Sequence, residues 1–414
     1  MLRNIGSIVL RHSRALRPAR AAKLHVAAMA AAPSERRAFA ALVEDFEREN
    51  PGIEVELLQL RGDGHRASAR DWLRQGAFDV VSGFGGAELQ ALATEGLVAP
   101  LDGLWAENGL ADQFSDPAQA TVTVDRRPYG VPFSIAPWQF YYRRSLFRRL
   151  GLTPPGNWAE FRRAISVLQG ARLTPIALGA RDLWPIGAWS DYLNLRLHGA
   201  EFHNRLLIGA VAPDDPRIPE IFEFWSELRP AFSADAAALR LDQAAAEVAG
   251  GNAGMVLLGG FAAPLFWEEM RDDLATFPFP RMRATVARAE DAPTDILLLS
   301  ARAANRDAAL RFLAYAARPG VQRAFNDPLG RLSPNRTAGH LAHPLVRAQA
   351  DLLASADDVV QFFNLDMLPH AAPQGLAVLR RFLADGDVRA AVAGLNAAVR
   401  LPAVAAAAAA AAAE

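Results

Sequence analysis

The sequence predicts an α/β protein built from two lobes. Its 414 residues exceed the size at which a single hydrophobic core usually stops growing, so we expect two domains or two lobes. In the N-terminal third, short runs typical of β-strands alternate with longer helical patterns. This alternation indicates a mainly parallel sheet with crossover helices. A hydrophobic fraction of 51% and a charged fraction of 21% are those of an ordinary globular protein with ample core material.

The clearest elements come first in the chain. A strand is expected over 24–29, and a helix begins at Ser34. That helix carries apolar side chains at helical spacing: Phe39, Leu42, Val43 and Phe46. A second strand is expected over 53–60 and a third over 78–82, which leads into a glycine turn at 83–86. Ligands of open α/β sheets lie beyond the carboxyl ends of strands, so this turn is expected to face a ligand.

Three extended segments predict places where the chain crosses between the lobes. The first lies near 131–135, where Pro132 fixes its φ angle. A return is expected at 277–283, which reads FPFPR and contains two prolines, and a third crossing near 331–334. Two or three extended crossings make a hinge.

Residues 127–199 hold the most informative part of the chain. In order they read RPYGVPFSIAPWQFYYRRSLFRRLGL, PPGNWAEF and TPIALGARDLWPIGAWSDYLNLRLHG. Before them come KLHVAAM, PSERRAFAALVEDFERENPGIEVELLQL and FDVVSGFGGAELQALATEGLVAPLDGLW. After them come GNAGMVLLGGFAAPLF, EDAPTDILLLSARAANRDAALRFLAYAARPGVQRAF and LGRLSPN. From about Lys23 to about Leu401, these pieces in this order resemble the family 1 extracellular solute-binding proteins of ABC transporters, the maltose-binding-protein-like, carbohydrate type.

The resemblance implies a two-lobed periplasmic-binding-protein fold of type II, each lobe a mainly parallel sheet flanked by helices. We expect the N-terminal lobe to comprise 23–132 and 283–330, and the C-terminal lobe 133–282 and 331–402. Residues 1–22 resemble a leader or a disordered segment. Residues 403–414 are almost entirely alanine and indicate low-complexity sequence or an artefact of expression.

Aromatic residues in the matching pieces are candidates for stacking on a sugar. The flat C–H face of a pyranose ring can lie on an aromatic ring while its hydroxyls stay free for polar contacts. The candidates are Trp138, Trp184, Trp189 and Phe261, with Phe84 in the glycine turn. The alternative for each is an ordinary core aromatic. Gly260 is expected to let the backbone approach a ligand or to let Phe261 swing in from a turn.

Charged residues in the same pieces are candidates for binding hydroxyl groups. A carboxylate accepts hydrogen bonds from two hydroxyls, and a guanidinium donates in a planar fork. The candidates are Asp182, Asp191, Asp295, Glu35 and Arg331. The alternative is solvated surface or helix capping, which suits Asp182 and Glu35, the latter in the first turn of a helix.

Composition and motifs disfavour several other classes of protein. The formal charge of -1 gives no basic surface for nucleic acid, and the chain has no cysteine nucleophile or thiolate metal site. The third glycine of a GxGxxG loop would fall at Glu88, and the only lysine, Lys23, is in no Walker motif. His340 and His343 do not form HExxH, so we expect neither a metal nor a cofactor.

We therefore interpret the chain as the sugar-binding component of a bacterial ABC importer, without enzymatic activity. The resemblance implies a sugar ligand, permease membrane subunits as partners, a monomer, and a periplasmic or extracellular location at the cell envelope. The N-terminal segment is an atypical export signal, because its apolar patch over 5–10 is short and arginines follow it.

Two alternatives remain. One is a sugar-binding protein that serves a signalling partner, which a weak leader or an unusual gene neighbourhood would favour. The other is a carbohydrate-active enzyme with two carboxylates in a cleft, such as Asp182 and Asp191, which release of reducing sugar would reveal.

Overall fold

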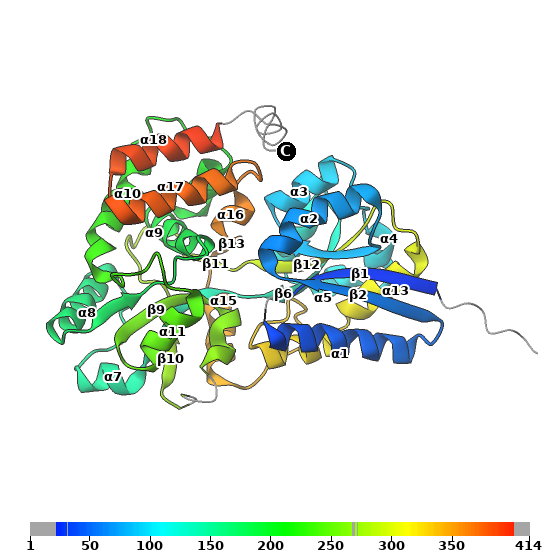
Figure 1. Cartoon of the computed structure of the whole chain (residues 1–414), viewed down its shortest axis with the longest axis horizontal. Helices are drawn as coiled ribbons and strands as arrows, with labels where there is room; N and C mark the ends of the chain where they lie inside the picture. The colour runs from blue at the N-terminus through cyan, green and yellow to red at the C-terminus, as the bar shows by residue number, and fades with distance from the viewer. Residues whose placement is uncertain (1–21, 31, 267–269, 271, 401–414) are drawn as a thin grey trace, which may run out of the picture.

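A computed structural model of the chain describes residues 22–30, 32–266, 270 and 272–400. The alanine-rich tail over 403–414 lies outside these residues. So does the leader-like segment, except for Ala22, which begins the first strand. Figure 1 shows two lobes side by side, joined by extended chain.

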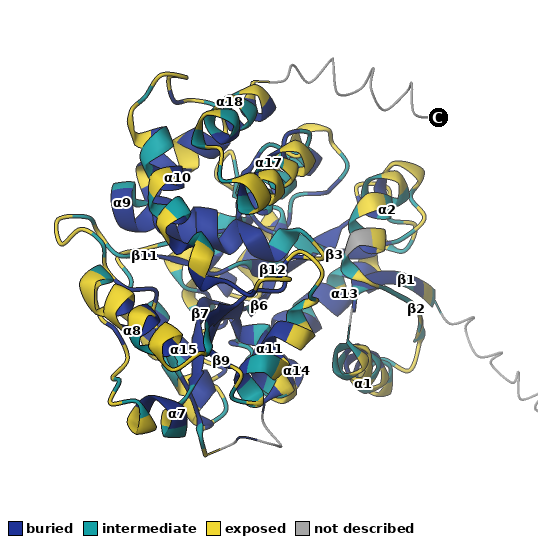
Figure 2. Cartoon of the chain, turned by 60° about the vertical axis from the view of Figure 1, so that its left-hand side comes forward, coloured by how far each residue is buried: buried dark blue, intermediate teal, exposed yellow. Residues whose placement is uncertain are grey.

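The first lobe is built on a five-stranded sheet in the order β2-β1-β3-β12-β6. Its strands are β1 (Ala22–Met29), β2 (Ile53–Leu60), β3 (Val80–Phe84), β6 (Gly130–Ile135) and β12 (Thr294–Leu299). β1 pairs in parallel with β2 and β3, whereas β12 pairs antiparallel with β3 and β6. The interior strands are buried, as Figure 2 shows.

Helices cover both faces of this sheet. They are α1 (Pro33–Glu49), α2 (Gly62–Gln75), α3 (Ala87–Thr94), α4 (Asp102–Glu107), α5 (Leu110–Gln113), α6 (Asp116–Val122), α13 (Arg306–Ala317) and α14 (Pro319–Asn326). The short strands β4 (Thr123–Val124) and β5 (Arg127–Pro128) form a hairpin. The expected stripe of α1 is buried, and Phe46 packs edge-on against Phe312 of α13. Periodic apolar residues therefore attach α1 to its lobe.

The second lobe is built on a four-stranded sheet in the order β10-β7-β9-β8. Its strands are β7 (Trp138–Arg143), β8 (Thr174–Ala177), β9 (Ala253–Gly259) and β10 (Leu274–Phe277). A two-stranded parallel pair, β11 (Ala289–Asp291) with β13 (Asp358–Val360), lies beside helix α9.

The helices of the second lobe enclose its aromatic core. They are α7 (Arg144–Arg149), α8 (Trp158–Gly170), α9 (Gly187–Leu207), α10 (Arg217–Leu228), α11 (Leu241–Ala249), α15 (Pro344–Ala354), α16 (Phe363–Asp366), α17 (Ala372–Asp385) and α18 (Val388–Val399). Two short 3₁₀ segments carry site residues: η1 (Trp184–Ile186) and η3 (Gly260–Leu265).

The architecture confirms the expected two-lobed α/β fold, with one difference in the sheets. Both are mixed: β7 pairs antiparallel with β9 and β10, and only β8 pairs in parallel with β9. One strand in each sheet, β12 in the first and β7 in the second, runs opposite to the others, and each of these two enters its lobe at a crossing. No crossover helix within the lobe therefore forces them to run parallel to their neighbours.

The crossings lie close to, but not always at, the expected segments. The first runs between the end of β6 at Ile135 and the start of β7 at Trp138, so the expected boundary at 132 falls inside β6. Leu332, in the segment where the third crossing was expected, bridges Ile135 at the first crossing. The expected return at 277–283 is wrong: Phe279 is buried in the second core, and the chain reaches the first sheet only at β12. The lobe boundaries in sequence otherwise stay a prediction.

Candidate functional site

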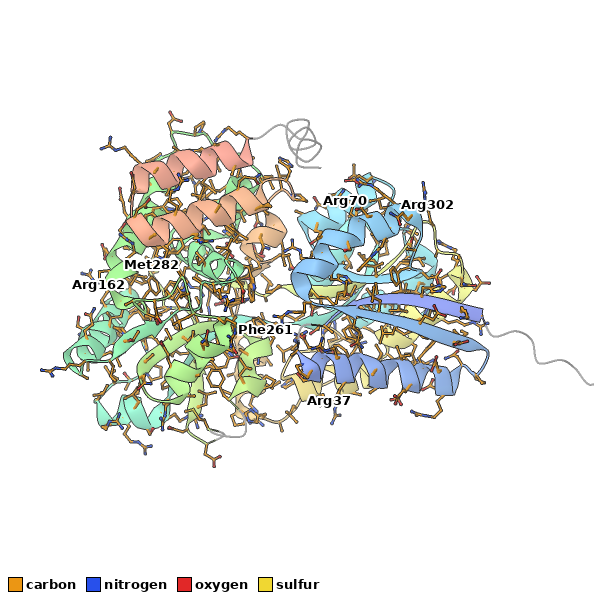
Figure 3. The ribbon with its side chains drawn as sticks, viewed as in Figure 1. Arg37, Arg70, Arg162, Phe261, Met282 and Arg302 are labelled. Atoms are coloured by element: carbon orange, nitrogen blue, oxygen red, sulfur yellow. The ribbon has the colours of Figure 1, made fainter. Side chains whose placement is uncertain are left out.

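Four aromatic side chains meet at the edge of the second lobe that faces the first, and we call them the aromatic quartet. They are Trp138, Trp184, Phe261 and Phe362. Trp138 stacks on Phe362 at 4.9 Å between ring centroids, and Trp184 lies edge-on to Trp138 at 5.8 Å. Figure 3 shows Phe261 on the side of its lobe that faces the first lobe.

The members of the quartet differ in exposure. Trp138 is completely buried and contacts the other three rings, whereas Trp184 and Phe261 are only partly buried. The indole Nε1 of Trp138 has no hydrogen-bond partner, which is costly for a buried donor. Trp184 and Phe261 are therefore the members whose ring surface is accessible to a ligand.

Close packing of a glycine pair places Phe261 in the quartet. Gly259 ends β9 directly opposite Trp138, and Gly260 begins η3. A Cβ at Gly259 would come within 2.4 Å of the Phe261 ring, and a Cβ at Gly260 within 2.1 Å of Gln349 Oε1. Any side chain at these two positions would therefore displace Phe261 or the adjoining helix α15.

A strained turn places Trp184. Leu183 has φ 62° and ψ -55°, and the backbone N–H of Trp184 donates to the carbonyl of Asp182 at 2.7 Å. This is a γ-turn of the rare, strained kind, adopted here by a residue with a branched side chain. Strain of this type persists where surrounding structure imposes it, and it is found most often at functional sites.

Three of the predicted charged residues form one network beside the quartet. Arg331 Nη1 lies 3.1 Å from Asp295 Oδ2, and Arg331 Nη2 donates to Glu35 Oε1. Burial raises the pKa of Asp295 to about 6, with a further increase from the charge of Glu35 and a decrease from Arg331. Glu35 also accepts the N–H of Ala32 at 2.8 Å, so it caps its own helix as well. We call these three residues the ion triad.

A hydrogen bond joins the strand that carries Asp295 to the segment that carries Phe362. The N–H of Thr294 donates to Gln361 Oε1 at 2.9 Å, which connects the residue before Asp295 to the residue before Phe362. The triad and the quartet are therefore parts of one region at the boundary between the lobes. It combines accessible ring surface with acceptors and a guanidinium, the groups that bind a ring carrying hydroxyls.

Two predicted site residues are buried, and a third lies exposed in the turn beside Trp184. Trp189 is buried in the second core, edge-on to Phe232 at 4.7 Å, because every residue of α9 from Gly187 to Leu197 is buried. Asp191, on the same helix, is also fully buried and accepts the N–H of Phe363 at 2.8 Å. Asp182 is exposed, and its carbonyl closes the γ-turn. The expected ligand contacts of Trp189 and Asp191 are not supported, since no face of either side chain is accessible.

A group of buried carboxyls lies behind the quartet. Burial raises the pKa of Asp191 well above its usual range, and the charge of Asp366 adds to this. Burial likewise raises the pKa of Asp291, whose neighbours Asp191 and Asp366 carry like charge. The pKa of Asp366 is raised to about 7 by burial. His203 Nε2 lies 3.7 Å from Asp191 Oδ1, and burial lowers the pKa of this histidine to about 3, so it supplies no positive charge near neutral pH.

The sequence analysis missed residues from two parts of the chain. Phe362, Gln361 and Asp366 reach the boundary from the C-terminal part, and Arg66 reaches it from α2. Phe84 was predicted and lies at the end of β3 under the guanidinium of Arg66, 5.8 Å from its ring centroid. No local motif marks the missed residues, since each contact joins segments distant in sequence.

The described residues include no group of three or more histidine, cysteine, aspartate or glutamate side chains arranged to hold a metal ion. None of the helices described is long and apolar enough to cross a membrane.

Comparison with known proteins gives a family match. The family model described as "Bacterial extracellular solute-binding protein" matches residues 32–323. An uncharacterized ABC transporter extracellular-binding protein of Pyrococcus horikoshii is 24% identical over 369 residues, which cover 86% of this chain and 79% of the relative. The multiple sugar-binding protein of Streptococcus mutans is 24% identical over 160 residues, 38% of this chain and 37% of that protein.

Solved structures show the same fold. The bacterial solute receptor AcbH, which is described as having an exclusive substrate preference for β-D-galactopyranose, superposes with a TM-score of 0.85 at 23% identity, covering 91% of this chain and 97% of AcbH. A chitin oligosaccharide binding protein superposes with a TM-score of 0.83 at 22% identity, covering 92% and 98%.

Proposed function

The chain belongs to the bacterial extracellular solute-binding proteins, and we propose that it is the sugar-binding component of an ABC importer. In this proposal a mono- or oligosaccharide binds between the lobes and is delivered to permease subunits in the membrane. The observation that carries the proposal is the aromatic quartet: Trp184 and Phe261 are only partly buried, and the ion triad lies at the same boundary between the lobes.

The proposed chemistry is recognition without reaction. A sugar ring would lie on Trp184 and Phe261 through its C–H face. Its hydroxyls would donate to the carboxylates of Glu35 and Asp295 and accept from the guanidinium of Arg331. A ligand that contacts both lobes stabilises the closed arrangement by its differential affinity for that arrangement. Names of related proteins support this class of ligand, since they include a multiple sugar-binding protein and a β-D-galactopyranose receptor.

The enzyme alternative gains no support from the arrangement of its candidate acids. Asp182 is exposed in a turn, whereas Asp191 is fully buried and bound to the backbone of Phe363. A glycosidase needs two carboxyl groups that flank one bond, and this pair does not provide them.

A thermal-shift screen of the full chain tests the proposal. The panel contains mono-, di- and trisaccharides together with polyol phosphates. A saccharide present at about 100 times its dissociation constant should add about 2.7 kcal/mol to the free energy of unfolding. We expect a clear shift with one saccharide class and no release of reducing sugar. If no saccharide of the panel shifts the unfolding temperature, or if the protein hydrolyses one of them, the proposal is contradicted.

A further inference from the structure

Helix α16 of the second lobe contacts α3 and α2 of the first. Figure 1 shows α16 on the side of its lobe that faces these two helices. Arg66 of α2 donates to the carbonyl of Asn364 in α16, with 3.4 Å between the atoms. The same guanidinium lies 3.4 Å from Glu88 Oε2, so a charged pair of the first lobe holds it in place.

Gly86, the N-cap of α3, lies at the centre of this contact. Its φ is 84° and its ψ is -142°. A Cβ on Gly86 would come within 2.9 Å of Asp366 Oδ1 and 3.1 Å of Gln361 Cγ, both in the second lobe. The two lobes therefore touch here with no room for even a methyl group.

Neither partner of Gly86 is free to move aside. Asp366 Oδ2 accepts the N–H of Gln361 at 2.9 Å. Gln361 is buried, and its Oε1 accepts the N–H of Thr294 at 2.9 Å. Displacing Gln361 would break a buried hydrogen bond, and displacing the partly buried Asp366 would break its bond to the N–H of Gln361; both losses are unfavourable.

We propose that the contact of Gly86 with Gln361 and Asp366 sets how closely the two lobes approach, so that Gly86 is a positioning residue for ligand capture. The part that concerns ligand capture rests on the proposed function. A side chain at Gly86 would hold the lobes apart, and the ligand would then bind to a less populated closed state. If the closed fraction falls tenfold, the apparent dissociation constant rises about tenfold.

The absence of cysteine from the chain makes lobe separation measurable. Arg37 on α1 and Arg162 on α8 are exposed and lie on different lobes, as Figure 3 shows. Spin labels on the double substitution Arg37→Cys and Arg162→Cys would report the distance between lobes by pulsed electron paramagnetic resonance, with and without ligand.

Three further variants in this labelled background separate contact between lobes from local strain. Gly86→Ala should shift the distances to longer values. Gly96→Ala, at the other end of α3, also has a positive φ, 68°, but a Cβ there meets nothing within 4 Å, so it should leave the distances unchanged. The double variant Gly86→Ala with Asp366→Ala removes Asp366 Oδ1, the atom closest to the new Cβ, so the distances between the labels should return most of the way to their shorter values. If backbone strain at residue 86 were the cause, the distances would stay long, because the second substitution does not relieve that strain.

The outcomes discriminate between the two proposals. The positioning role is wrong if Gly86→Ala and Gly96→Ala give the same distances between the labels. It is also wrong if adding Asp366→Ala to Gly86→Ala does not shorten those distances again. Because the distances are measured without ligand as well, a shift in Gly86→Ala supports the contact even if no saccharide binds. Saccharide binding by the unsubstituted chain, with unchanged affinity in Gly86→Ala, would leave the proposed function intact and overturn the positioning role. Thermal unfolding of each variant verifies that it is folded.

Discussion

The two sides of the boundary between the lobes are built differently. The second lobe contributes rings: Trp184 and Phe261 rest on the buried Trp138. The first lobe contributes charge and a glycine turn, through Glu35, Asp295 and the residues that follow β3. Stacking on a ring depends only weakly on how the ligand is oriented, whereas hydrogen bonds to charged groups and to the backbone require a defined orientation of the ligand. We infer that affinity depends mainly on the second lobe, and that orientation and closure depend mainly on the first.

The largest expected effect tests the charged side. Arg331→Ala would leave Glu35 and Asp295 close together without their shared cation, in a setting where all three side chains are largely buried. We expect a loss of about 3 kcal/mol in the free energy of unfolding, measured by urea denaturation.

Arg127→Ala is the matched control for this change. Its guanidinium pairs with Asp102 in three hydrogen bonds, but both side chains are about half exposed to solvent. An exposed pair contributes little, so the unfolding midpoint should hardly move. Equal losses in the two variants would show that the ion triad has no special role in stability.

The second prediction tests the ring side. Trp184→Ala removes an accessible ring, and saccharide binding measured by calorimetry should weaken by about thirtyfold, equivalent to about 2 kcal/mol. Trp158→Ala is the control, because Trp158 is also partly buried but packs against Phe161, Phe224 and Phe279, away from the quartet. Affinity that survives in Trp184→Ala would place the ligand elsewhere.

The third prediction concerns the carboxyls behind the quartet. The pKa values of Asp191, Asp291 and Asp366 are raised in the folded chain above the usual 3.8. Between about pH 4 and pH 7 the folded state therefore binds more protons than the unfolded state, and these groups lower stability as pH rises through that range.

Asp291→Asn tests this sign. The substitution removes one titrating group, so stability should fall less between pH 5 and pH 7.5 than in the unsubstituted chain. We expect the two unfolding equilibrium constants to diverge by about tenfold or more over this interval. Parallel pH profiles would mean that Asp291 is not protonated in the folded chain.

The smallest expected effect concerns the strained turn. Leu183→Gly would relieve the unfavourable φ of 62° and should stabilise the folded chain by about 1 kcal/mol. Saccharide affinity should fall at the same time, because Trp184 loses its fixed position. A variant that binds as tightly as the unsubstituted chain would show that the turn does not serve the site.

The sequence predicted the first lobe better than the second. Apolar spacing in α1 and the strand patterns of β1 and β2 are local signals, and the structure confirms them. The two prolines of the FPFPR segment indicate extended chain but do not show which core Phe279 joins, so the sequence alone could not place this segment in the second lobe. Alternation of strands and helices also could not show that β12 runs antiparallel to its neighbours.

Part of the site was also accessible from the sequence. The ordered resemblance pointed to Trp184 and Phe261, which contact each other in the structure, and to the members of the ion triad, which form one network. That these residues bind a ligand stays a prediction. The resemblance could not distinguish Trp184 from Trp189, because the two tryptophans are only five residues apart, yet Trp184 follows the strained turn and Trp189 lies in the fully buried part of α9. Phe362 was missed because its partner Trp138 lies far away in sequence.

The most direct test is a crystal structure of the full chain with the saccharide that gives the largest thermal shift. We predict a sugar ring against Trp184 and Phe261, with hydroxyls bonded to Glu35, Asp295 or Arg331. A saccharide bound instead outside the boundary, for example in the open hollow beside Tyr142 and Phe147, would contradict the account.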